Sequence, residues 1–196
     1  KLYREYQDHE VDDSSLRDML RTAMQGRKVL VLAPGGSLKR QQEKIDDFVA
    51  QESPFIFSAN FVSHRYAADY TFCSNAMRYD DMVVERRDKN ILVTSNLLDV
   101  CEEENVLNYA ELSFDEKGNC DNCVIMLLKL LCQLGVPQVF VAGFDGYQEK
   151  GNNYISSYMA SQHTKGMEEN VKIRKYMEDV GIQISVVFLT DSLYNE

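Results

Sequence analysis

The sequence predicts an α/β fold of the Rossmann-like class, with a mostly parallel sheet flanked by helices on both faces. Apolar runs of strand length alternate along the chain with segments of helical spacing. The first apolar run, 29–33, is followed by Pro34 and by Gly35-Gly36, which permit a tight turn into a helix near Ser37. Strands that alternate with helices favour parallel pairing through right-handed crossovers.

The first half of the chain shows this alternation clearly. Cap residues at 12–15, apolar residues at helical spacing from 16 to 23 and a glycine at 26 predict a short amphipathic helix. A second helix is expected from Ser37 to just before Pro54, with apolar residues on one face. Further short apolar runs predict strands at 55–59, 70–73 and 91–94, with a helix through Met77 and Met82 between the last two.

The second half continues the pattern. A strand is expected at 106–110, and the nearly continuous apolar run 124–134 predicts a helix enclosed by the fold. Gly135 and Pro137 are typical of the residues that end such a helix. A buried strand at 139–142, a helix at about 164–180 and a last strand at 182–189 complete the prediction. We expect residues 1–27 to form a connecting arm and an N-terminal helix, and residues 28–196 to form a single domain.

Composition narrows the classes of function. The chain has 196 residues and a formal net charge of −10, with 31 acids against 21 Lys and Arg, which argues against nucleic acid as a partner. No apolar run approaches the length of a membrane span, so no membrane partner is expected. Five cysteines suit reduced thiols and a cytoplasmic location. Because the chain begins at Lys1 without methionine or an apolar leader, we expect a piece of a longer protein.

Polar residues follow several predicted strands, at the edge where ligands bind in open α/β sheets. A glycine turn before a helix exposes backbone N–H groups and the positive end of the helix dipole, which attract phosphate; any α/β protein also needs such turns, and both interpretations stay open. Asparagine and serine at strand ends either form a binding cleft or simply cap the next helices. The candidate ligand-binding residues are Gly35, Gly36, Ser37, Asn60, Asn75, Arg78 and Asp145.

Two further motifs have competing interpretations. Cys120 and Cys123 form a Cys-x-x-Cys pair, but no second pair at zinc-finger spacing accompanies it, so we favour small core residues and predict no metal site. His163 lies in a polar, tyrosine-rich segment between Tyr154 and Lys165. It is a candidate general base, although its spacing alone is typical of a surface histidine before a helix.

Several segments, in order, resemble bacterial sialyltransferases of the single-Rossmann kind. They are 32–38, Asn60-Phe61, 72–75, Arg78-Tyr79, Leu134-Gly135, 141–147, Tyr154 and 163–165. The resemblance implies a nucleotide-sugar pocket in which the glycine turn and the asparagines hold a cytidine nucleotide. It also implies that Tyr147 and Tyr154 stabilise the departing phosphate and that His163 deprotonates the acceptor hydroxyl. The chain differs from this family at Pro34, where the family has Asn, and at 121–123, where an acid precedes the buried helix.

A second resemblance concerns the context of the domain. The arm 3–13 and the segments 26–32 and 142–147 resemble the C-terminal domain of bacterial proteins of the 4-hydroxy-2-oxovalerate aldolase kind. In those proteins a barrel of the hydroxymethylglutaryl-CoA lyase type precedes this domain. The resemblance implies that aldolase chemistry resides in that N-terminal barrel and not in these 196 residues.

Three hypotheses follow. The first is an accessory domain that binds a nucleotide, nucleotide-sugar or other small phosphorylated ligand beside an N-terminal aldolase-like domain. The second is a sialyltransferase-like glycosyltransferase with His163 as general base. The third is a non-catalytic assembly module, for which a homodimer is the expected form.

Overall fold

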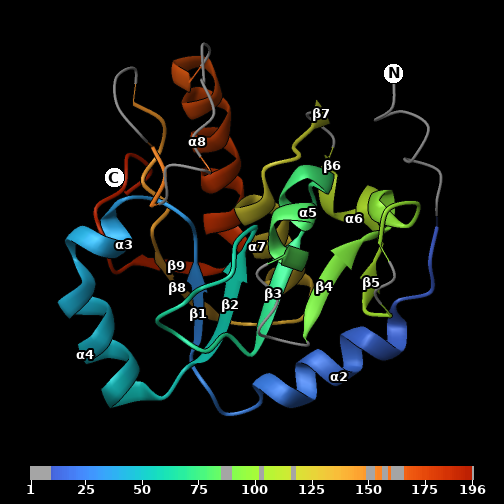
Figure 1. Ribbon diagram of the computed structural model, residues 1–196, viewed down its shortest axis with the longest axis horizontal. Coiled ribbons are helices and arrows are strands. Elements are labelled where there is room, and N and C mark those ends of the chain that lie inside the picture. The colour runs from blue at the N-terminus through green and yellow to red at the C-terminus, as the bar shows by residue number, and fades with distance from the viewer. Residues whose placement is uncertain are drawn as a thin grey trace.

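The main sheet lies at the centre of the structure, with helices packed on both of its faces (Figure 1). The computed structural model describes residues 10–84, 90–101, 104–115, 118–148, 153–155, 159 and 166–195. Every strand pairing in the seven-stranded sheet is parallel, so the protein has an α/β Rossmann-like fold. In the part of the chain that is described, no helix has both the length and the apolar character needed to cross a membrane.

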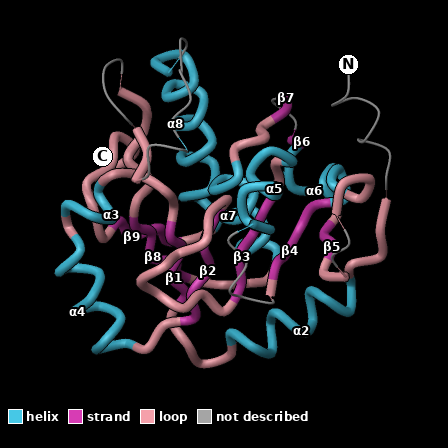
Figure 2. The backbone as a smooth tube through the Cα atoms, in the orientation of Figure 1, coloured by secondary structure: helices cyan, strands magenta, loops and turns pink. Residues whose placement is uncertain are grey.

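The elements follow the order expected for alternating strands and helices (Figure 2). The strands of the main sheet are β1 (Val29–Leu32), β2 (Phe55–Ala59), β3 (Tyr70–Cys73), β4 (Ile91–Thr94), β5 (Val106–Leu107), β8 (Gln138–Ala142) and β9 (Ser185–Phe188). The helices are α2 (Ser14–Met24), α3 (Ser37–Arg40), α4 (Gln42–Glu52), α5 (Ala76–Val84), the 3₁₀ turn η1 (Ser95–Leu97), α6 (Tyr109–Ser113), α7 (Cys123–Gln133) and α8 (Gly166–Gln183). A separate antiparallel pair joins β6 (Phe114–Asp115) to β7 (Gly118–Asn119).

The strand order β5-β4-β3-β2-β1-β8-β9 contains one change of direction. From β1 to β5 each new strand is added on one side, whereas β8 returns to the other side of β1 and β9 continues outward from it. The loops that leave β1 and β8 therefore diverge at the carboxyl ends of two adjacent strands. This is the topological switch point, where open α/β sheets bind their ligands.

Strand β1 shows how the two faces of the sheet are covered. Val29, Val31 and Ala33 belong to a core cluster that includes residues of α2, α7 and α8. Leu30 and Leu32 point to the opposite face, into a cluster that includes Ile45 of α4. All four residues of β1 are buried, as a central strand of a parallel sheet requires.

Three element predictions need correction. The helix expected from Ser37 to Pro54 consists of α3 and α4, separated at Gln41, whose side chain accepts a hydrogen bond from the Asp191 N–H (2.9 Å). The strand expected at 106–110 ends at Leu107, and Tyr109 begins α6. The last strand begins at Ser185 because α8 continues to Gln183.

Candidate functional site

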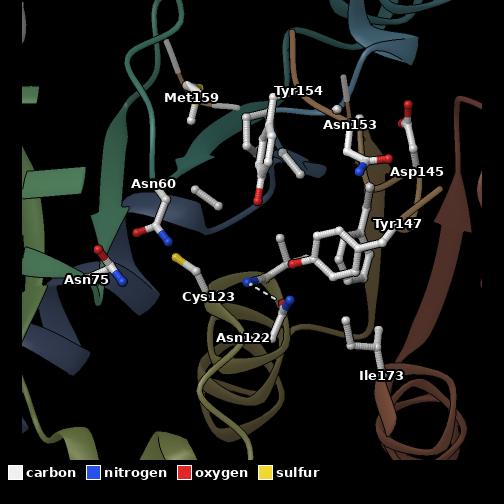
Figure 3. A pocket seen from close by; sticks show the side chains of 18 of the residues that line it. Asn60, Asn75, Asn122, Cys123, Asp145, Tyr147, Asn153, Tyr154, Met159 and Ile173 are labelled. Carbon is white, nitrogen blue, oxygen red and sulfur yellow. Dashed lines mark hydrogen bonds between the residues drawn. The ribbon is translucent and has the colours of Figure 1, made fainter. Parts of the chain in front are cut away.

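A cleft of about 290 Å³ opens at the carboxyl ends of the central strands, at the switch point between β1 and β8 (Figure 3). The loops after β1, β2, β3 and β8 form it, together with residues of α5, α7 and α8 and with Tyr194 after β9. Segments that are far apart in the sequence thus supply one lining. The cleft occupies the edge of the sheet at which the sequence predicts a ligand.

Most of the predicted site residues come together in this cleft. Those that line it are Gly35, Asn60, Asn75, Arg78, Asp145, Tyr147 and Tyr154. Gly36 and Ser37 are not among the lining residues, and the Ser37 side chain is fully buried. His163 lies outside the described residues.

The glycine turn is occupied by a carboxylate of the protein itself. The Ser37 N–H donates to Asp145 Oδ2 (2.8 Å), and the Ser37 hydroxyl donates to Asp145 Oδ1. Arg40 Nη2 adds a third contact to Asp145 Oδ2 at 3.2 Å. An anion thus already sits at the start of α3, and it is supplied by the loop after β8. Ser37 therefore fixes that loop and does not reach the cleft.

Glycine is required here because two loops cross closely. A Cβ atom on Gly35 would lie 2.2 Å from the Gly143 carbonyl oxygen and 2.6 Å from Asp145 Oδ1. The Gly35 N–H donates to the same Gly143 carbonyl at 2.8 Å, and the Gly143 N–H donates to Thr190 Oγ1 at 2.9 Å. Because Gly35 has no side chain, the loops after β1 and β8 can make this contact at the floor of the cleft.

Three asparagines line the cleft, and their side-chain amides are hydrogen-bonded in the same way. The Oδ1 atom of each accepts a backbone N–H: Asn60 from Ser74 (3.3 Å), Asn75 from Arg78 (3.2 Å), and Asn122 from Val124 (3.1 Å) and Ile125 (3.2 Å). These contacts cap α5 and α7 at Asn75 and Asn122. Within the residues that the structure describes, the Nδ2 groups of these three asparagines make no hydrogen bond, so each amide can donate to a ligand.

Arg78 lines the cleft, but its guanidinium is already engaged. Its side chain is only 10% exposed, and Nη2 donates to the carbonyl oxygen of Met159 at 2.8 Å. Nη1 lies 3.5 Å from Asp81 Oδ2, and the guanidinium carbon lies 5.4 Å from the centre of the Tyr154 ring. Arg78 thus ties α5 to the segment that contains Tyr154 and Met159.

Tyr147 and Tyr154 bring two phenol groups together. Their hydroxyls point into the same part of the cleft, on the side where Asn60 and Cys123 lie (Figure 3). Burial raises the pKa of Tyr147 above its ordinary value, and the neighbouring Tyr154 raises it further. Tyr147 therefore remains protonated at neutral pH. The side chains of Tyr147 and Tyr154 also share a hydrogen bond, so the two phenols form one polar group in the cleft.

Other residues fix the backbone of each tyrosine. The Tyr147 N–H donates to Asn170 Oδ1 (2.9 Å), and Asn170 Nδ2 donates to the Tyr147 carbonyl (2.7 Å). Asn170 Oδ1 also accepts from the Tyr194 hydroxyl at 2.7 Å. Tyr154 forms a β-bridge with Gly35, so the segment 153–155 lies directly on the glycine turn.

Cys120 and Cys123 are both buried free thiols within the main core cluster, in agreement with the predicted packing role. Burial raises the pKa of Cys123 above its ordinary value, so this cysteine is a thiol and not a nucleophilic thiolate. Among the described residues, no group of three or more His, Cys, Asp or Glu side chains could hold a metal ion.

Sequence reasoning missed several residues of the site. Asn122 has a local signal, since an asparagine directly before a long apolar helix is a typical cap. Asn153, Glu169 and Tyr194 also line the cleft, and Asn170 supports it from behind. No local pattern predicts these four, because they reach the cleft from a long loop, from α8 and from the end of the chain.

Comparisons of the chain with protein families, with curated proteins and with solved structures found no match. The fold and the cleft therefore define the class of the protein, an α/β Rossmann-like protein with a polar cleft at the switch point of its sheet. The two resemblances in the sequence stay predictions.

Proposed function

We propose that this domain binds a nucleotide or nucleotide-sugar in the cleft at the β1/β8 switch point. The observation that carries the proposal is the convergence of the amides of Asn60, Asn75 and Asn122 with the phenols of Tyr147 and Tyr154. Amide and phenol groups recognise the carbonyl and hydroxyl oxygens of bases and sugars without adding charge. The volume of about 290 Å³ suits a ligand of nucleoside size.

The proposed setting is that of an accessory C-terminal domain in an aldolase-type protein. The sequence resemblance of 26–32 and 142–147 supports this setting, and these two segments contain β1, the last residue of β8 and the loop that carries Tyr147. An N-terminal aldolase-like domain would then be the partner within the same protein, and lyase activity would belong to that partner.

A second candidate is a glycosyltransferase. The observation that favours it is the meeting of the Tyr147 and Tyr154 hydroxyls in the cleft, since two phenols can stabilise the charge of a departing phosphate. In this proposal His163 is the general base. Replacing His163 by Ala would abolish transfer to an acceptor and leave donor binding intact; unchanged transfer by that variant would contradict this candidate.

Binding is tested by thermal unfolding and calorimetry with cytidine, uridine, adenosine, their phosphates and the corresponding nucleotide-sugars. A ligand at about a hundred times its dissociation constant adds about 2.7 kcal/mol, which raises the melting temperature by roughly 5–10 °C. Asn60→Asp removes the Nδ2 donor and retains the acceptor for the Ser74 N–H, and Tyr154→Phe removes one cleft hydroxyl. We expect each variant to weaken binding about five- to tenfold.

Tyr66→Phe is the matched control, because its hydroxyl bonds to Asp46 (2.8 Å) outside the cleft. This control should bind as the unmodified protein does. If no compound in the panel binds, or if the three variants bind alike, the proposed function is wrong.

A further inference from the structure

The charges around the cleft are mainly negative. Among its described lining residues the carboxylates are Asp121, Asp145 and Glu169, and the one cation is Arg78. Asp121 is exposed and Glu169 is partly exposed, at the start of α7 and α8 respectively. A ligand that enters between these helices therefore approaches carboxylates before it reaches the asparagines. A carboxylate that lines the cleft opposes the entry of a phosphate, because both groups carry negative charge.

Two of these acids are paired with cations outside the lining: Asp145 lies 3.2 Å from Arg40 Nη2, and Glu169 accepts a hydrogen bond from Lys172 Nζ (2.9 Å). Within the described residues, Asp121 makes no ion pair.

Arg78, the one cation among the described lining residues, is not available to balance Asp121. Arg78 donates to the Met159 carbonyl, lies 3.5 Å from Asp81 and covers the Tyr154 ring. With 10% of its side chain exposed, it cannot turn toward a phosphate without breaking these buried contacts.

Three of the backbone donors at the turns that could bind phosphate are also occupied. At the glycine turn the Ser37 N–H is taken by the Asp145 carboxylate. At the start of α7 the N–H groups of Val124 and Ile125 donate to Asn122 Oδ1. Both places thus present an oxygen of the protein where a phosphate-binding turn would present N–H groups.

The remaining recognition groups are neutral. The Nδ2 groups of Asn60, Asn75 and Asn122 and the two cleft phenols carry no charge. Such groups bind hydroxyl and carbonyl oxygens well, but they do not compensate the charge of several phosphates. The lining as a whole suits a ligand that is rich in hydroxyl groups and poor in charge.

We infer that the cleft selects the least charged members of the nucleotide class, so that a nucleoside binds more tightly than its monophosphate and the monophosphate more tightly than its di- and triphosphate. This inference rests on the proposed function and deepens it. Selection comes from the exposed carboxylate of Asp121 and from the prior engagement of Arg78 and of the N–H groups of Ser37, Val124 and Ile125.

The test is a calorimetric comparison of cytidine with its 5′-mono-, di- and triphosphates, in the presence of a chelator, repeated with the adenosine series. At low salt we expect each added phosphate to weaken binding about three- to tenfold. High salt should reduce these differences, because it screens charges near the surface. Affinity that rises with the number of phosphates overturns the inference and leaves the proposed function standing. Absence of binding by every compound overturns both.

The variant Asp121→Asn tests the assigned cause, because it removes the unpaired acid and leaves the ion pair between Glu169 and Lys172 intact. This variant should reduce the ratio of the dissociation constants of the cytidine phosphates to that of cytidine at least threefold. It should change the dissociation constant of cytidine itself less. Asp47→Asn on α4 is the matched control, since it removes an exposed acid that does not line the cleft. This control should leave that ratio of dissociation constants unchanged. A ratio that is equal in the unmodified protein and in both variants would contradict selection by the Asp121 carboxylate.

Discussion

At the scale of single residues, Gly143 is the glycine beside the cleft at which an added Cβ atom would come closest to the backbone of another loop. Its φ angle is +78°, and a Cβ atom built there would lie 2.0 Å from the Ala33 carbonyl oxygen and 2.6 Å from Leu38 Cγ. Two requirements thus meet at one position: a left-handed backbone and the absence of a side chain. The cleft depends on both, because they set the β8 loop against the β1 loop.

Gly135 offers a direct comparison for this residue. Its φ angle is +77°, but no atom lies within 4 Å of its would-be Cβ. Gly135→Ala should therefore lower the free energy of unfolding only by the left-handed cost of about 1–2 kcal/mol. Gly143→Ala adds a backbone clash and should lose at least about 2 kcal/mol more. Urea unfolding measures both, and equal losses would show that the close approach is unimportant.

At the scale of elements, Asn170 joins α8 to the loop after β8. Its amide makes hydrogen bonds with both the N–H and the carbonyl of Tyr147 and accepts one from Tyr194. Asn170 is only 6% exposed, so water cannot easily replace these partners. One side chain thus fixes the backbone of a cleft tyrosine.

Replacing Asn170 by Ala should lower the free energy of unfolding by about 2–4 kcal/mol, because it leaves buried partners without hydrogen bonds. Tyr194→Phe removes only the bond between its hydroxyl and Asn170 and should lower it by about 1 kcal/mol. Chemical denaturation of both variants measures the two losses. A loss for Asn170→Ala no larger than that for Tyr194→Phe would contradict the assigned role.

A second link between elements joins α4 to the loop after β2. Asp46 accepts from Arg65 Nε (3.0 Å) and Nη2 (2.5 Å) and from the Tyr66 hydroxyl (2.8 Å). The hydrogen bonds from Arg65, and then that from Tyr66, lower the pKa of Asp46 from 3.8 to about 2. A lowered pKa means that the carboxylate form of Asp46 is more stable in the folded protein than in the unfolded chain.

This link predicts a dependence of stability on pH. The contribution of Asp46 is complete above its unfolded pKa of 3.8 and is lost as the pH falls through about 2. Asp46→Asn should therefore be less stable than the unmodified protein at neutral pH, and the difference should close over that window. Urea unfolding at several pH values measures it, with Asp47→Asn on the same helix as the control variant. A difference that persists at the lowest pH would contradict this link.

At the scale of the whole molecule, local patterns and long-range contacts determine different features. The bounds of β2, β3 and β4 follow from apolar runs ended by polar or turn residues, and they were predictable. The end of β5 was not, because 106–110 is apolar enough for a strand and tertiary packing decides that Tyr109 starts a helix.

The same division applies to the cleft. Residues directly after strands were found because strand ends of a parallel sheet meet at one edge. The burial of Ser37 was not predictable, because its partner Asp145 lies 108 residues away in the sequence. Asn170 likewise acts through Tyr147, across 23 residues. Local sequence thus indicates where a ligand binds, whereas distant contacts decide which groups are available to it.

The central claim is that a nucleoside-type ligand binds at the β1/β8 switch point. Titration of ¹⁵N-labelled protein with cytidine, followed by amide chemical shifts, tests it most directly. We predict saturable changes at Gly35, Asn60, Asn75, 122–124 and Tyr147, which surround the cleft. Changes confined to the groove between α8 and β9, or no changes at all, would contradict the claim.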